Sequence, residues 1–327
     1  MTEETAPTVT AVADGPRVVA LGGGHGLAAS LAALRMLTER LTAVVTVADD
    51  GGSSGRIRRE LSAVPPGDLR MALATLAGDD EWGRTWGDLL QYRFGGTGAL
   101  AGHPVGNLLL TGLAELTGDT VAALDLTGRL LGAIGRVLPM STVPLEIVAE
   151  VAGIDDDPMS TRLIRGQVAV ATTPGRVLSV SVVPRDPPAC GPAVQAVRDA
   201  DFVVLGPGSW FTSVLPHLLV PELAEALAET RAQRVVALNL APQAGETDGF
   251  SPETHLDVLC AHAPKLRIDA VVADAASTAG GGGLAATVRR LGARLVLAPV
   301  AAADGTARHD PRLLAEAYRQ VFGGAMM

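Results

Sequence analysis

A run of five residues, four of them glycine, is the first feature of this 327-residue sequence that has the makings of a binding site. Gly22-Gly23-Gly24-His25-Gly26 directly follows the apolar residues Val18 to Leu21, and a helix-like run, Leu27 to Leu37, comes next. Backbone N–H groups at a helix start attract anions, because the helix dipole adds partial positive charge there. Glycine leaves room for a phosphate and permits positive φ. The alternative is a tight turn that binds nothing.

A second cluster combines acids, glycines and hydroxyls after the next apolar run, Leu41 to Ala48. Its sequence is Asp49-Asp50-Gly51-Gly52-Ser53-Ser54-Gly55. Two carboxylates beside a phosphate would repel it unless one holds a sugar hydroxyl or both, Asp49 and Asp50, bind a cation, for which Mg²⁺ is expected. The serines can donate to phosphate oxygens. An Asx-type turn, in which the acids accept local N–H groups, is the alternative.

A third cluster, Gly206-Pro207-Gly208-Ser209, follows the apolar run Asp201 to Leu205, with Thr212 one turn further on. Ser209 and Thr212 are predicted donors to phosphate or ribose. We expect this loop to lie on a strand adjacent to the first loop, where the strand order reverses. Two such loops indicate a ligand with two ends, such as a nucleotide joined to another group.

Four further polar residues stand at predicted element boundaries. Asp68 follows a Pro-Pro-Gly turn and is placed to N-cap a helix that runs to about Ala77, with a second role toward ligand left open. Asn107 precedes the apolar helix Leu108 to Leu116, where it could N-cap that helix or read a base or sugar edge. Asn239 and Gln243 follow the apolar run Arg234 to Leu238 and are predicted ligand contacts.

Composition excludes several classes of protein. Lys265 is the only lysine, so neither a P-loop nor a pyridoxal Schiff base can be built. The net charge of −9 and the lack of a basic run argue against a nucleic-acid partner. No apolar run reaches the roughly 18 residues of a membrane span. Two cysteines, Cys190 and Cys260, are expected to be reduced thiols, which favours a cytoplasmic location.

The apolar runs named above, with Asp269 to Ala273 and Arg294 to Pro299, predict an α/β fold with a mostly parallel sheet. Short β-branched segments predict a small antiparallel insertion at about residues 136–185; they are Leu145 to Val151, Val168 to Ala171 and Arg176 to Val183. Residues 1–16 are expected to be a disordered tail, and 17–327 a single domain. A weaker interpretation, a nicotinamide dehydrogenase, rests on the G-x-G-x-x-A of Gly24 to Ala29 with Asp49.

Six blocks in this order carry a family resemblance: ALGGGHG, VTVADDGGSSGR, PPGDLR, GHPVGNLLL, VLGPGSWFTSVLP and NLAPQAGETDGFS. Together they resemble the gluconeogenesis-factor (YvcK-like) family, within the superfamily of phospholactate transferase (CofD). The resemblance runs from about Arg17 to the C-terminal helix. It implies a Rossmann-like three-layer α/β/α fold, binding of UDP-N-acetylglucosamine, and a role in bacterial cell shape and carbon metabolism.

The resemblance does not imply an established catalytic activity, and it names no catalytic residue. The transferase relatives use Mg²⁺ and a deazaflavin substrate. His25 stands where the family usually has Thr, and Ala244 where many relatives have Pro. Two functions remain open: a regulator that binds a nucleotide sugar without turnover, and a Mg²⁺-dependent transferase of a phosphoryl-linked group. A homodimer is also left open, and protein partners are not predicted.

Overall fold

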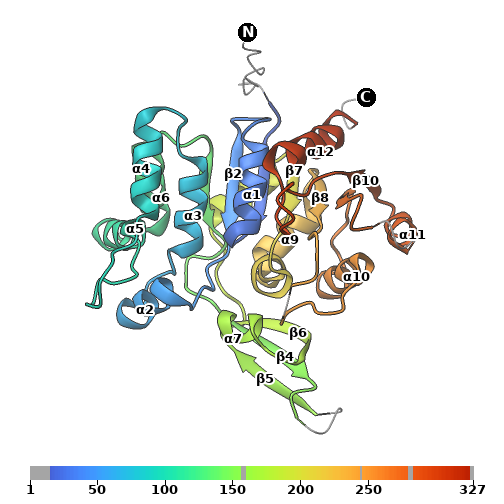
Figure 1. The fold of residues 1–327 in the computed structure, drawn as a ribbon, viewed down its shortest axis with the longest axis horizontal. Coiled ribbons are helices and arrows are strands. Elements are labelled where there is room, and N and C mark those ends of the chain that lie inside the picture. Colours follow the sequence, from blue (N-terminus) through green and yellow to red (C-terminus); the bar gives the residue numbers. More distant parts are fainter. Residues whose placement is uncertain (1–14, 156–159, 244, 279–282, 325–327) are drawn as a thin grey trace.

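The computed structural model describes residues 15–155, 160–243, 245–278 and 283–324, and within them the largest element is a parallel sheet of seven strands (Figure 1). Its inner strands are buried because helices cover both faces, as their apolar sequences predict, whereas the edge strand β10 is partly exposed. β1 pairs with β2 on one side and with β7 on the other, so the strand order reverses at the β1–β7 pair. From edge to edge the strands are β10 (Arg294–Ala298), β9 (Ala270–Asp274), β8 (Gln233–Ala237), β7 (Phe202–Leu205), β1 (Val18–Gly22), β2 (Leu41–Val45) and β3 (Arg136–Pro139).

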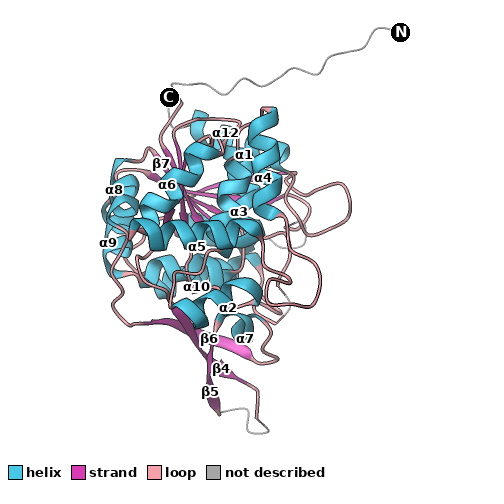
Figure 2. Cartoon of the chain, turned by 90° about the vertical axis from the view of Figure 1, so that its left-hand side faces the viewer, coloured by secondary structure: helices cyan, strands magenta, loops and turns pink. Residues whose placement is uncertain are grey.

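Helices cover both faces of this sheet, which confirms the predicted α/β fold. Figure 2 shows α1, α3 and α12 on one side of the strands and α8 and α9 on the other. The helices are α1 (Gly24–Leu34), α2 (Gly52–Leu61), α3 (Gly67–Leu76), α4 (Glu81–Gln91), α5 (Val105–Thr117), α6 (Thr120–Leu130), α8 (Gly191–Asp199), α9 (Pro221–Glu229), α10 (Pro252–His262), α11 (Gly283–Arg290) and α12 (Pro311–Gly323). None of the described helices combines the length and apolar character that crossing a bilayer requires.

α1 is the helix that fixes the first glycine loop in place. Its apolar face, which includes Leu27, Leu31 and Leu34, is fully buried against the sheet and its neighbours. A buried hydrogen bond of 2.7 Å between the hydroxyls of Ser30 and Tyr318 ties α1 to α12. Burial of a whole leucine side chain contributes about 1.5–3 kcal/mol, so these contacts hold the start of α1 rigidly at the end of β1.

A small antiparallel sheet, in the order β5-β4-β6, forms a lobe at the carboxyl edge of the main sheet. Figure 1 shows this lobe at the opposite end of the molecule from α12. The lobe is the predicted insertion, but it begins after β3, because residues 136–139 pair with β2 in the main sheet. Its elements are β4 (Glu146–Ala152), β5 (Thr161–Arg165), α7 (Gln167–Ala171) and β6 (Arg176–Val183).

Two details of the lobe differ from the prediction. Val168 to Ala171 lie in a short helix, α7, where β-branched residues had predicted a strand. A carboxylate from outside the lobe, that of Asp50, accepts the Val168 N–H at 3.0 Å, and this tertiary contact stabilises the helix start. β5 was not predicted, since its largely exposed sequence TRLIR lacks a regular apolar alternation. Almost all of the predicted tail lies outside the described residues.

Candidate functional site

The two predicted glycine loops meet at the carboxyl ends of β1 and β7. These strands are neighbours in the sheet, as expected, so Gly22, the last residue of β1, and Gly206, which directly follows β7, lie at adjacent strand ends. A Cβ on Gly26 would lie only 2.3 Å from the Pro207 carbonyl oxygen. Glycine at position 26 is therefore what allows the two loops to pack directly on each other.

The first loop is also the start of α1. The helix begins at Gly24, three residues earlier than predicted, with Gly23 as its N-cap. Gly24 has φ +57°, and a Cβ there would meet no heavy atom within 4 Å. The space beside Gly24 in the first turn of α1 is thus open, although the Asp68 carboxylate lies against the N-cap Gly23. An anion bound by backbone N–H groups needs such room at a helix start.

Asn239, from the segment after β8, holds the second loop. Its side-chain oxygen accepts the Gly208 N–H at 2.9 Å, and its amide donates to the Gly208 carbonyl oxygen at 2.8 Å. Gly208 has φ +141°, a conformation that glycine adopts readily. The predicted polar residue at this strand end therefore shapes the loop, and its amide is committed to that contact.

A cavity of about 300 Å³ opens where the two loops meet the segment after β8. Gln243 lines it, and the buried Oε1 atom of this residue has no hydrogen-bond partner among the described residues. Leaving such an acceptor unpaired in the interior costs about 1–3 kcal/mol. The lining residues are His25, Gly26, Ala29, Pro207, Gly208, Asn239, Leu240, Ala241, Pro242, Gln243, Ala307, Arg308 and His309.

Ser209 and Thr212 bind a residue that the sequence analysis did not single out, Glu246. The Ser209 hydroxyl hydrogen-bonds the Glu246 carboxylate, whose Oε1 accepts the N–H groups of Phe211 and Thr212 at 2.8 and 2.9 Å. Glu246 thereby closes the start of a π-helical turn, Trp210–Val214 (η1), where a regular helix was expected. Burial raises the pKa of Glu246, against the opposing effect of these hydrogen bonds. Glu246 lies 37 residues from Ser209, so no local pattern indicated the pairing.

Asp68 reaches the first glycine loop from α3. The helix begins at Gly67 with Pro66 as N-cap and no side-chain cap, so the predicted capping role of Asp68 is wrong. Its carboxylate instead lies against the first glycine loop, where the nearby Gly24 N–H opposes the rise of its pKa. Although part of the residue reaches solvent, the carboxyl lies deep among protein atoms, and burial followed by the nearby charge of Asp49 raises its pKa to about 7.

The acidic cluster after β2 is divided between two roles. Asp49 Oδ1 accepts the Gly51 N–H at 2.9 Å in an Asx-type turn, whereas Asp50 Oδ1 accepts the Val168 N–H of the lobe. The segment was expected to be a loop, but α2 begins inside it at Gly52. The N-cap of this helix is Gly51, whose backbone is extended. The fold thus brings Asp49 beside Asp68, while the carboxylate of Asp50 is directed at α7.

The described residues hold no cluster of three acidic, histidine or cysteine side chains suited to a metal. Mg²⁺ is commonly bound by one or two carboxylates and takes its other ligands from phosphates and water. The mutual repulsion of Asp49 and Asp68, expressed in the raised pKa of Asp68, is relieved by a cation between them. These two carboxylates therefore fit such an ion.

Ser53 and Asn107 belong to a buried network beside this acid pair. Asn107 lies within the first turn of α5, whose N-cap is Pro104, so the predicted N-cap role of Asn107 is wrong. Its Nδ2 donates to Ser53 Oγ at 2.9 Å, and its Oδ1 accepts from Nε of Arg70 at 2.9 Å. The Ser53 hydroxyl also bonds His103 Nδ1 at 2.7 Å. The other serine, Ser54, accepts the Gly67 N–H at 3.0 Å.

Comparison with known proteins places this site in a family. Residues 18–283 match the family described as 2-phospho-L-lactate transferase CofD. The chain belongs to this family. It is 59% identical over 301 residues to a putative gluconeogenesis factor of Mycobacterium tuberculosis (strain ATCC 25618 / H37Rv), covering 91% of this chain and 88% of the relative.

More distant relatives carry the same name. A gluconeogenesis factor of Listeria monocytogenes is 40% identical over 254 residues, covering 78% of this chain and 76% of the relative. A crystal structure of a UPF0052 family member from Bacillus halodurans superposes with a TM-score of 0.82 at 32% identity, covering 94% of this chain and 99% of that one. The expected relation to gluconeogenesis factors is thereby confirmed, and the fold with it.

Proposed function

We propose that this chain is a regulatory protein that binds a nucleotide sugar, UDP-N-acetylglucosamine or a close relative. The observation that carries the proposal is the direct contact of the two glycine loops at the β1–β7 switch point, beside a cavity of about 300 Å³. Ligands of open parallel sheets bind at this position. Its expected setting is cytoplasmic, with a link to cell shape and carbon metabolism.

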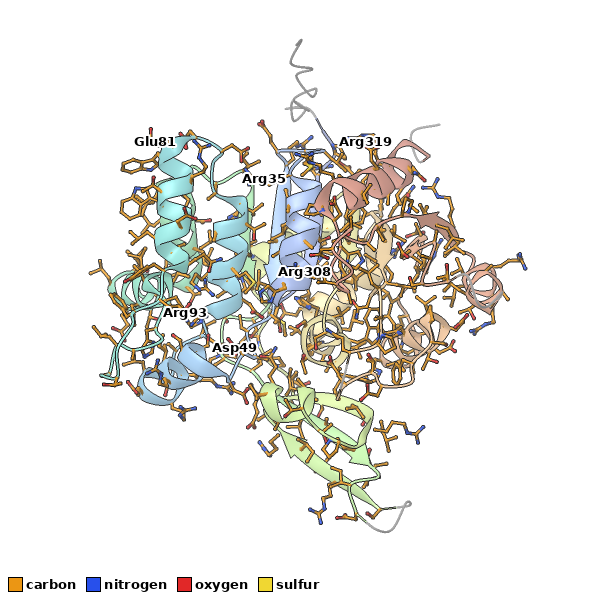
Figure 3. The ribbon with its side chains drawn as sticks, viewed as in Figure 1. Arg35, Asp49, Glu81, Arg93, Arg308 and Arg319 are labelled. Carbon is orange, nitrogen blue, oxygen red and sulfur yellow. The ribbon has the colours of Figure 1, made fainter. Side chains whose placement is uncertain are left out.

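The diphosphate is proposed to lie on the N–H groups at the start of α1, in the open space beside Gly24. The nucleoside would then occupy the cavity lined by His25, Asn239 and Gln243. Figure 3 shows Arg308, another lining residue, near the lower end of α1, with Asp49 below the same edge. The sugar extends toward Asp49 and Asp68.

A second function, transfer of a phosphoryl-linked group, is favoured by one observation. Asp68, with its pKa raised to about 7, can hold or release a proton near neutral pH, next to the proposed phosphate site. When bound, Mg²⁺ would supply charge neutralisation to the transferred group at Asp49 and Asp68. Within the described residues the site shows no activated nucleophile, so an acceptor molecule would have to provide one.

Isothermal titration with UDP-N-acetylglucosamine, NAD and a deazaflavin, each with and without Mg²⁺, tests the ligand class. We expect heat only with the nucleotide sugar, and intact recovery of that ligand after prolonged incubation. Binding of NAD or the deazaflavin in its place would overturn the ligand assignment. Product in molar excess over protein, with or without an added acceptor, would replace the regulator by the transferase.

A further inference from the structure

Arg70, in the first half of α3, is a buried cation without an acidic partner. The residue is 4% exposed, and its Nε donates to Asn107 Oδ1 at 2.9 Å. Within the described residues its two Nη groups form no hydrogen bond and no ion pair, and solvent still reaches them. Buried arginines are normally paired, because an uncompensated charge in the interior is costly.

The network around Arg70 fixes the direction of its guanidinium. Asn107 is 1% exposed and is itself held by Ser53, which in turn bonds His103. All members are buried, so the Nε edge of Arg70 is anchored and the Nη edge is left to bind something else. A guanidinium held in this way is preorganised for a planar oxyanion.

A second unpaired arginine stands beside the first. Arg93 follows α4, and its backbone pairs with Pro104 while its Nη1 donates to the Gly102 carbonyl oxygen at 2.8 Å. The pKa of Arg70 is lowered to about 10. Burial is the largest cause, and the positive charge of nearby Arg93 is the second. Figure 3 shows Arg93 on the same side of the molecule as Asp49, at the lower end of α3 and α4. Two neighbouring cations repel each other unless an anion lies between them.

Two nearby carboxylates, Asp68 and Asp49, raise the pKa of Arg70, but burial and Arg93 have the larger effect and lower it. Asp49 is turned to the Gly51 N–H, and Asp68 to the Gly24 N–H, and neither forms an ion pair with Arg70 or Arg93. Asp68, which lies against the first glycine loop, nevertheless senses the charge of Arg70, and neither arginine lines the cavity of about 300 Å³. A ligand lying across that loop would present its far end to the arginines.

We propose that Arg70 and Arg93 form a subsite for a second anionic group, a phosphate or a carboxylate, beyond the diphosphate. This inference rests on the proposed function, since it places the subsite at the sugar end of a bound nucleotide sugar. The anion has two sources with the same chemistry. It is carried either by the sugar, as in a uronic acid, or by a separate phosphorylated or carboxylate molecule that binds next to the nucleotide sugar.

Two titrations distinguish these sources. The first compares UDP-glucuronic acid with UDP-glucose, which differ by one carboxylate. The second adds inorganic phosphate, and separately phosphoenolpyruvate, to protein saturated with UDP-N-acetylglucosamine. The variant is Arg93→Gln, at an exposed residue whose loss leaves the core intact. The matched control is Arg84→Gln. Arg84 is an exposed arginine on α4, so this substitution removes the same charge at another surface position. Arg70→Lys keeps the buried charge but removes the planar fork.

We expect a wild-type preference for the anion in at least one titration, and about a tenfold loss of that preference in Arg93→Gln but not in Arg84→Gln. Arg70→Lys should show a similar loss. A preference in the first titration assigns the anion to the sugar, and one in the second to a separate molecule. Equal behaviour of Arg93→Gln and Arg84→Gln in both titrations would overturn the subsite. UDP-N-acetylglucosamine has a neutral sugar, so its own affinity reports on the proposed function independently.

Discussion

Replacing Asp68 by Asn should abolish a pH dependence of nucleotide-sugar binding that is set by the carboxyl at the first glycine loop. The pKa of Asp68 is raised to about 7, first by burial and then by Asp49. A group with that pKa is about nine-tenths protonated at pH 6 and about one-tenth protonated at pH 8. The ligand's diphosphate keeps its charge over this range. If the diphosphate binds only beside neutral Asp68, its affinity without Mg²⁺ falls about tenfold from pH 6 to pH 8.

The reason is electrostatic. Two unit charges about 5 Å apart in an effective dielectric of about 20 repel by about 3 kcal/mol, more than the tenfold effect requires. Mg²⁺ should reverse the direction of the pH dependence, because it binds the ionised carboxylate of Asp68. The affinity with Mg²⁺ should therefore rise from pH 6 to pH 8, and binding should release a proton. The raised pKa also means that the folded state holds the extra proton between about pH 4 and pH 7. The free energy of unfolding should therefore decrease as pH rises through this window.

Isothermal titration at pH 6, 7 and 8, with and without Mg²⁺, measures both slopes in the wild type and in Asp68→Asn. The asparagine variant cannot ionise, so its affinity without Mg²⁺ should not change with pH, and Mg²⁺ should have little effect on it. A wild-type affinity that is independent of pH would refute the reasoning. A slope that survives in Asp68→Asn would assign the titration to a group other than Asp68.

The second glycine loop supplies two further predictions. Asn239→Ala removes both hydrogen bonds to Gly208, so we expect a loss of about 1–3 kcal/mol in unfolding free energy and weaker binding of UDP-N-acetylglucosamine, measured by urea denaturation and titration. An unchanged affinity would show that this loop does not shape the site. Ser209→Ala removes a bond to Glu246, and we expect it to lower stability by about 1 kcal/mol with little change in affinity. A tenfold loss of affinity at unchanged stability would place Ser209 on the ligand instead.

The parallel sheet was predictable because its strands are buried on both faces and therefore form continuous apolar runs. Residues 18–21 and 202–205 show this most clearly, and their adjacency followed from the general rule for ligand sites in open sheets. Local patterns failed where a distant side chain decides the structure. α7 begins where Asp50 accepts the Val168 N–H, and the π-helical turn after Ser209 is closed by Glu246.

For the polar residues of the site, too, local sequence indicated the positions but not the distant partners. The sequence indicated that Asp68, Asn107 and Asn239 were important, because each stands at the start of a helix or the end of a strand. It did not indicate their partners, since Asp68 reaches Gly24 across more than forty residues and Asn107 bonds Arg70 from another helix. Arg70 itself carried no signal beyond its place in the block PPGDLR. Partners of this kind follow from the packing of α3 and α5, which no short motif encodes.

The position of the diphosphate can be tested with a matched pair of glycine substitutions. Gly24 and Gly118 both have positive φ, +57° and +66°, and a Cβ on either meets no heavy atom within 4 Å. Gly24→Val and Gly118→Val should each lower stability by about 1–2 kcal/mol or somewhat more, because valine is strained at positive φ. Only Gly24→Val places a branched side chain before the start of α1. Titration with UDP-N-acetylglucosamine should show wild-type affinity for Gly118→Val and no measurable binding for folded Gly24→Val. Wild-type affinity in Gly24→Val would show that the diphosphate does not lie at the start of α1.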